Sequence, residues 1–215
     1  MAPAREVRGD GILAAMSTAR GEFADSALPW RQRLLEVPED VPRSAWYGRL
    51  AAFVLLAIWG TSVVFGRMTD PPALLHLTVI LFHEAGHVLF SPFGEALRVA
   101  GGTLGQLLMP LVCAVALHRQ GDNFGAALGL AWLSLSGIDA SIYAYDAFDP
   151  VLPLIGGGTG ADSFHDFIFL FDRYGQLHHA RGWAIAMKVL GTVGLYASLA
   201  WAAVLVYLQG ESLDG

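Results

Sequence analysis

Charged residues are scarce in this chain. Asp, Glu, Lys and Arg together make up 15% of the 215 residues, whereas hydrophobic residues make up 54%. A typical soluble domain carries about 25% charged residues. The net charge of −6 is small and scattered, and no run of Lys or Arg resembles a phosphate-binding patch. These absences argue against a nucleic-acid partner and favour a membrane protein.

Cysteine is nearly absent, because Cys113 is the only one. No disulfide can therefore form within the chain, and we expect Cys113 to pack as a small apolar side chain. A cleavable signal peptide is not expected either, because residues 1–45 mix arginines with acids and contain no apolar stretch of the required length. The first apolar run begins at Trp46 and is long enough to stay in the bilayer as an uncleaved anchor.

Long apolar runs dominate the rest of the sequence. A helix needs about 20 apolar residues to cross the hydrocarbon core. Five runs approach or exceed that length and contain few ionisable side chains: 46–66, 72–90, 99–117, 124–144 and 182–209. We therefore predict an all-α, polytopic integral membrane protein with about five transmembrane helices. Its parts are a polar N-terminal tail (residues 1–45) with one short helix near residues 28–36, a transmembrane domain (46–209) and a short C-terminal tail (210–215).

The connection between the fourth and fifth runs departs from this pattern. Residues 156–160 read Gly-Gly-Gly-Thr-Gly, and residues 162–171 form an apolar run that is too short to span. The glycines do not form a phosphate loop, because no Lys-Ser/Thr pair follows them and no strand precedes them. We expect a re-entrant or interfacial helix in this connection.

Arginines near the ends of the runs predict an orientation, since cytoplasmic loops are enriched in Lys and Arg. With five crossings, the N-terminal tail, Arg98, Arg173 and Arg181 fall on one side. Arg67, Arg119 and the C-terminal tail fall on the other. We therefore expect a cytoplasmic N-terminus and a C-terminus on the outer side.

The second run contains the strongest chemical signal, the motif His83-Glu84-Ala85-Gly86-His87. Residues four apart share a helix face, so both imidazoles can bind one metal ion. Glu84 lies beside them, where it can take a proton from metal-bound water. An ionisable side chain deep in a span costs about 3 kcal/mol, and metal coordination would offset that cost. The alternative is a pair of buried histidines satisfied by hydrogen bonds.

In the form Phe82-His-Glu-Ala-Gly-His-Val88, this motif resembles the site-2-protease-like membrane zinc metallopeptidases. The resemblance implies a multi-helix core, one Zn²⁺ per chain held by His83 and His87, and Glu84 as the base. It also implies cleavage of a membrane protein or peptide within or beside the bilayer, and location in a bacterial inner membrane. Members of that family usually take a third ligand from an Asp that precedes Gly in a later membrane helix.

The third ligand is where this chain departs from the family. Its only Asp-Gly pairs, Asp10-Gly11 and Asp214-Gly215, lie in the polar tails. In the predicted topology, the connection after the fourth run lies on the inner side, at the level of the two histidines. We therefore expect His165 or Asp166 to complete the site, with Asp162 as a further alternative. A side chain of this group that does not bind the metal could orient a ligand instead, or His165 and Asp166 could merely cap a surface helix.

Two further polar groups lie in the runs. Ser136, Asp139 and Tyr143 share one helical face of the fourth run, and such groups usually point towards the interior of a bundle. Asp139 could support the site or make a structural contact. His76 shares a face with the motif but lies about 10 Å from His83 along the helix, too far for a common metal.

The sequence thus predicts a membrane-embedded zinc metalloprotease that hydrolyses peptide bonds through a metal-activated water. The alternative is a metal-binding, non-hydrolytic accessory subunit of a membrane complex. Glu84 distinguishes the two, because a purely structural metal site does not need that carboxylate.

Overall fold

The computed structural model describes residues 30–38, 41–155 and 157–214, which form helices, turns and loops with no strand among them. The chain divides into two compact units, Met1–Glu36 and Val37–Gly215. The first contributes one described helix, α2 (Trp30–Leu35), where a short helix was predicted. Most of the predicted tail, including Asp10-Gly11, lies outside the described residues. All elements below belong to the second unit.

Five helices of this unit are long and apolar enough to cross a membrane, which confirms the predicted all-α membrane architecture. They are α3 (Arg43–Val64), α4 (Ala73–Phe90), α5 (Glu95–Arg119), α6 (Asn123–Asp146) and α8 (Ala180–Asp214). Three short elements connect them: η1 (Ser91–Phe93), α7 (Asp166–Arg173) and η2 (Leu177–His179). The residues expected to form a C-terminal tail continue α8 as far as Asp214.

Helix α6 is the most enclosed of the five. Of its apolar 18-residue segment, 61% is buried, compared with 11% for α3. It packs between α5 and α8, and small residues allow close approach. A Cβ at Gly191 of α8 would lie 2.8 Å from the Ser134 carbonyl oxygen of α6. Small residues are a common means of helix association in lipid. The core around α6 draws buried side chains from four helices: Val63, Leu75, Val79, Ala131, Leu135, Ile138, Leu195 and Leu199.

Polar contacts place the start of α3 beside the end of α8. Arg43 Nη2 donates to the Leu213 carbonyl oxygen at 3.3 Å, and Arg49 Nη1 donates to Gln209 Oε1 at 2.8 Å. Arg49 Nη2 also lies 3.7 Å from Asp122 Oδ1, in the turn between α5 and α6. The start of α3, this turn and the end of α8 therefore lie together, at what we call the Arg43 end.

The opposite end of the unit, the α7 end, holds the end of α3 and the start of α8. Lys188 Nζ in α8 donates to the Gly66 carbonyl oxygen, just after α3, at 2.8 Å. A cation is favourable at this position because the carbonyl groups at a helix C-terminus carry partial negative charge. Arg173 of α7 lies 3.5 Å from Glu95 at the start of α5, so these two elements also lie at the α7 end.

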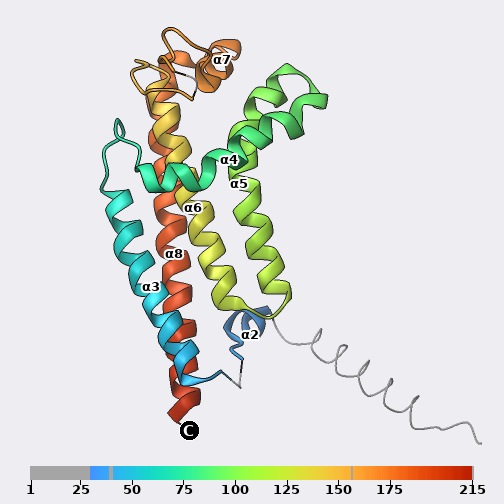
Figure 1. The fold of residues 1–215 in the computed structure, drawn as a ribbon, viewed down its shortest axis with the longest axis vertical. Coiled ribbons are helices and arrows are strands. Elements are labelled where there is room, and N and C mark those ends of the chain that lie inside the picture. The colour runs from blue at the N-terminus through green and yellow to red at the C-terminus, as the bar shows by residue number, and fades with distance from the viewer. Residues whose placement is uncertain (1–29, 39–40, 156, 215) are drawn as a thin grey trace, which may run out of the picture. The chain divides into compact units, whose positions relative to one another are not determined.

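Helix α4 lies across the other long helices, close to the α7 end (Figure 1). The chain thus passes to the α7 end along α3, stays there through α4, returns along α5 and passes twice more along α6 and α8. The start of α3 and the end of α8 therefore lie at the same end of the unit, whereas the sequence predicted them on opposite sides of the membrane. Hydropathy measures the length and apolarity of a run but not its direction, so it could not distinguish a helix that lies across the bundle from one that runs along it.

The arginines are consequently distributed differently from the prediction. Four of them lie at the α7 end and three at the Arg43 end: Arg67, Arg98, Arg173 and Arg181, and Arg43, Arg49 and Arg119, respectively. Basic residues flank both ends, so a cytoplasmic N-terminus stays a prediction. The two histidines of the motif lie towards the α7 end. The motif therefore lies at the opposite end of the bundle from the start of α3, whereas the sequence predicted both on the same side.

Candidate metal centre

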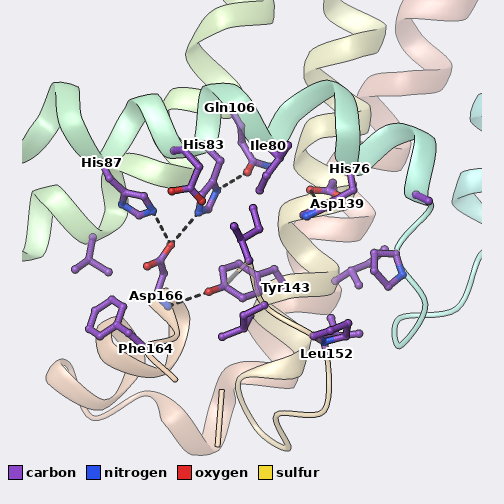
Figure 2. A pocket seen from close by; sticks show the side chains of 18 of the residues that line it. His76, Ile80, His83, His87, Gln106, Asp139, Tyr143, Leu152, Phe164 and Asp166 are labelled. Atoms are coloured by element: carbon purple, nitrogen blue, oxygen red, sulfur yellow. Dashed lines mark hydrogen bonds and ion pairs between the residues drawn. The ribbon is translucent and has the colours of Figure 1, made fainter. Parts of the chain in front are cut away.

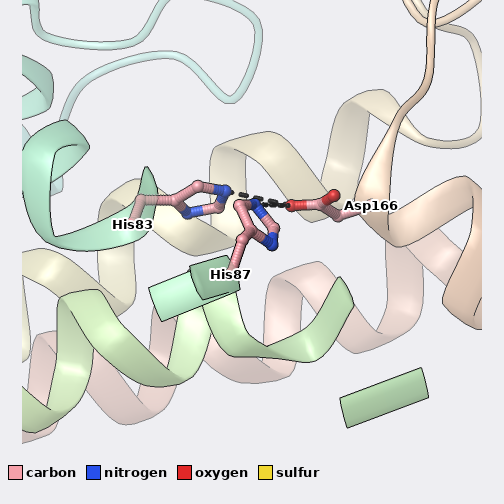
Figure 3. A group of neighbouring side chains, drawn as sticks. All are labelled: His83, His87 and Asp166. Carbon is pink, nitrogen blue, oxygen red and sulfur yellow. Dashed lines mark hydrogen bonds and ion pairs between the residues drawn. The ribbon is translucent and has the colours of Figure 1, made fainter. Parts of the chain in front are cut away.

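The two histidines of the motif meet a carboxylate from α7. His83 and His87 lie one turn apart on α4, with their ring centroids 4.9 Å apart, as the helical spacing predicts. Asp166 is the first residue of α7, and its Oδ2 lies 3.0 Å from His83 Nε2 and 3.3 Å from His87 Nε2 (Figure 3). His83 and Asp166 are 83 residues apart in the chain, so distant segments bring together three side chains that could bind a metal.

Hydrogen bonds on the other ring nitrogens fix how the histidines face. His83 Nδ1 lies 2.8 Å from Gln106 Oε1, and Gln106 Nε2 in turn donates to the Ser136 carbonyl oxygen at 2.9 Å. His87 Nδ1 lies 2.9 Å from the Arg98 carbonyl oxygen. Since both partners are oxygen acceptors, each Nδ1 carries the proton and donates it. Both Nε2 atoms therefore keep a lone pair for a metal, which is the usual support of histidine ligands.

The three ligand atoms fit a zinc site. They all lie within 4.8 Å of one another. In a tetrahedron with metal–ligand bonds of about 2.1 Å, neighbouring ligand atoms are about 3.4 Å apart. The distances from Asp166 Oδ2 to the two Nε2 atoms, 3.0 and 3.3 Å, are close to that value. Two histidines and one aspartate are three protein ligands, the number that leaves the fourth position of a catalytic zinc open for water.

The electrostatics of Asp166 suit a ligand as well. Burial by itself raises the pKa of this carboxyl, but the imidazoles of His83 and His87, which face it, outweigh burial and lower its pKa below the ordinary value. The carboxylate is thus held in the ionised form, which is the form that binds a metal.

Glycine at position 102 lets α5 pass behind the ligands. A Cβ there would meet His83 Nε2 and would lie 2.7 Å from His87 Cε1. The same helix pair is in backbone contact nearby, since a Cβ at Gly101 would lie 2.6 Å from the Gly86 carbonyl oxygen. The close packing of α4 on α5 is therefore what brings Gln106 and the Arg98 carbonyl within reach of the two imidazoles.

A pocket of about 580 Å³ opens beside the three ligands. Glu84 is exposed and lines it, next to both histidines in the sequence. The pocket extends to His76, whose Nδ1 lies 3.2 Å from Asp139 Oδ1 (Figure 2). Helix α5 contributes Arg98, Val99 and Gln106 to its lining. Apolar side chains from α4, α6 and the connection that follows α6 line much of the rest: Ile80, Ile142, Leu152, Pro153, Leu154, Ile155 and Phe164.

Among the three predicted alternatives for the third ligand, the structure brings Asp166 to the histidines. His165 lies elsewhere, because its Nδ1 accepts from the Ile168 N–H at 3.3 Å and its Nε2 points towards Asp146. Asp162 is exposed and belongs to no metal-binding group among the described residues. Asp139, considered as a support for the site, makes its contact with His76 instead.

Two residues of this region were not singled out from the sequence. Gln106 is a polar side chain in an otherwise apolar run, and a buried amide inside a membrane helix needs a partner. Asp146 continues the spacing of Ser136, Asp139 and Tyr143 along one face of α6. The predicted fourth run ended at Ala144, two residues too early to include it.

Comparison of the chain with protein-family models, curated proteins and solved structures gives no match. The resemblance to membrane zinc metallopeptidases therefore stays a prediction that rests on the residues of the motif.

Proposed function

We propose that this chain is a membrane-embedded, zinc-dependent peptide hydrolase. The observation that carries the proposal is the convergence of two histidine Nε2 atoms and one carboxylate oxygen beside a pocket that Glu84 also lines. In this proposal, His83, His87 and Asp166 would hold one Zn²⁺ beside the pocket.

Each residue then has a distinct task. Bound zinc would lower the pKa of a water towards 7. Glu84 accepts the proton of the attacking water and returns it to the leaving amine. Gln106 and the Arg98 carbonyl oxygen hold the imidazoles in the orientation that presents Nε2.

The pocket indicates the kind of substrate. Apolar residues make up about half of its lining, and it extends from the three proposed ligands to the His76–Asp139 pair. The proposed substrate is an extended segment of a membrane protein or peptide, because its apolar side chains can pack on the apolar part of this lining. The proposed cleavage takes place at the α7 end.

The alternative, a non-hydrolytic metal-binding subunit, does not use Glu84. A structural site needs its ligands and their hydrogen bonds, but it has no need of an exposed carboxylate beside them. The position of Glu84 in the pocket therefore favours hydrolysis.

The test compares the wild type with Glu84→Gln, each produced in membranes and examined by mapping newly formed peptide N-termini. Zinc content is measured on the same preparations. We expect equal zinc and a 10²- to 10⁴-fold loss of cleavage, roughly the contribution of a general base. Glu95→Gln is the matched control, because Glu95 is exposed at the same end and outside the pocket. Identical cleavage products from the wild type and Glu84→Gln would contradict hydrolysis by this site.

A further inference from the structure

Behind the third ligand lies a second buried polar pair. Asp146, the last residue of α6, is 4% exposed, and His165, immediately before α7, is 3% exposed. Asp146 Oδ2 and His165 Nε2 lie 3.5 Å apart, and neither atom has a hydrogen-bond partner elsewhere in the described part of the chain. Buried polar atoms are rarely left in this way, so the two atoms are each other's natural partner.

The hydrogen bonds around the pair determine which atom carries a proton. His165 Nδ1 accepts from the Ile168 N–H, so the proton is on Nε2, facing Asp146 Oδ2. The other carboxylate oxygen, Asp146 Oδ1, accepts from the Val151 and Leu152 N–H groups at 2.9 and 3.0 Å.

Helix α6 also contacts His165 and Asp166 through Tyr143. The Tyr143 hydroxyl oxygen accepts from the Asp166 N–H at 3.1 Å, and the Tyr143 ring stacks on His165 with centroids 4.1 Å apart. Tyr143 and Asp146 are three residues apart and so lie on one face of α6. One face of a well-packed helix thus holds both His165 and the backbone of the metal ligand that follows it.

We propose that Asp146 and His165 are positioning residues that set the location of Asp166 beside His83 and His87. This proposal rests on the proposed metal site, and it gives His165 a role other than binding the metal. It also goes beyond the capping of α7, since a cap needs only an acceptor for the Ile168 N–H and not the contact with Asp146.

Two conservative variants separate positioning from capping. In Asp146→Asn, the side-chain oxygen can still accept from Val151 and Leu152, but the amide N–H₂ now faces the His165 N–H, and two donors repel. In His165→Asn, the new side chain is a favoured N-cap and can accept from the Ile168 N–H. It is too short, however, to reach Asp146 as the imidazole does.

The experiment binds Co²⁺ to the purified full chain in detergent and records its visible absorption spectrum and its affinity. We expect both variants to bind about 10- to 100-fold more weakly than the wild type, as for other residues that orient metal ligands. Their Co²⁺ spectra should change, because Asp166 is displaced. The double variant should be little worse than either single one, since both remove the same contact. Asp149→Asn, at an exposed position nearby, should resemble the wild type.

The outcomes can be told apart. Wild-type affinity and spectrum in both variants would overturn the positioning role while leaving the metal site intact. Weaker Co²⁺ binding in Asp146→Asn alone would mean that His165 only caps α7, and would also overturn the positioning role. A wild type that binds no Co²⁺ or Zn²⁺ would overturn the metal site and this inference together. Metal binding that depends on the pair, without any hydrolysis, would support positioning and contradict only the peptidase. If Asp146→Asn does not fold, His165→Asn carries the test, and circular dichroism verifies folding of each variant.

Discussion

The two ends of the helical unit use polar side chains in different ways. At the Arg43 end, polar groups join one helix to another: Arg43 donates to the Leu213 carbonyl oxygen, and Trp46 Nε1 donates to the Val206 carbonyl oxygen at 2.9 Å. At the α7 end, polar groups converge instead. His83, His87 and Asp166 face one another, and buried or backbone groups hold each of them.

This difference shows how the fold separates stability from chemistry. The partners at the Arg43 end are backbone carbonyls, the neutral amide of the buried Gln209 and the partly exposed carboxylate of Asp122. Each of these contacts can be lost without leaving a buried charge. The α7 end buries several titratable groups around a pocket, and their cost is offset if they bind a metal. Because α4 lies across the bundle there, its motif contacts α5, α6 and α7 within two turns.

The comparison first depends on the two ends being on opposite sides of a membrane. In a Cys113→Ala background, single cysteines at Ser44, Ser163 and Ser212 report on the exposed start of α3, the connection before α7 and the end of α8. We expect a membrane-impermeant maleimide to label positions 44 and 212 from the same side, and position 163 only from the other. Labelling of 44 and 212 from opposite sides would contradict the arrangement of α4.

Gly102→Ala should have the next largest effect. The new methyl group would occupy the space of His83 Nε2 and would lie 2.7 Å from His87 Cε1. Both imidazoles can rotate away, so we expect the protein to fold but to lose its metal, as measured by mass spectrometry of purified protein. Gly137→Ala is the control, because a Cβ at that helical position meets nothing within 4 Å. Unchanged zinc content in Gly102→Ala would mean that α5 does not lie so close to the ligands.

Gln106→Met should have an intermediate effect. The substitution keeps the side-chain length but leaves His83 Nδ1 and the Ser136 carbonyl oxygen without their partners. We expect metal affinity to fall about 10- to 100-fold, measured by competition with a chelator. Gln106→Glu retains an acceptor for His83 and should lose less. Equal affinity in all three proteins would show that Gln106 does not orient the ligand.

Arg49→Ala, at the Arg43 end, should have the smallest effect. It removes the hydrogen bond to the buried Gln209 amide and the contact with the partly exposed Asp122. We expect a loss of about 1 to 3 kcal/mol in the free energy of unfolding in detergent, because the Gln209 amide oxygen loses its partner, and no change in metal affinity. A clear loss of metal from this variant would contradict the separation between the two ends.

The sequence predicted the helices better than their arrangement. All five apolar runs are helices, and the spacing of His83 and His87 correctly placed both rings on one face. The direction of α4 was not predicted correctly. Its apolarity reflects its surroundings and does not indicate whether the helix runs along the bundle or lies across it. The short helix after the glycines was predicted as a segment, but its start at Asp166 depends on capping by His165 and on Tyr143, which lies far away in the sequence.

The choice between His165 and Asp166 could not be made from sequence for the same reason. Adjacent residues at a helix start point in different directions, and only the packing of α7 against α6 decides which one faces α4. From the sequence, either His165 or Asp166 could face the two histidines of the motif, and only the structure distinguishes them.

The most direct test of the central claim is the zinc content of purified wild type, Asp166→Ala and Asp162→Ala, measured by mass spectrometry on the same day's preparations. Asp162 is the matched control, since it is an exposed carboxylate in the same connection. We predict about one zinc per chain in the wild type and in Asp162→Ala, and loss of zinc from Asp166→Ala. Zinc retained in Asp166→Ala, or lost from Asp162→Ala, would contradict the assignment of His83, His87 and Asp166 as the metal ligands.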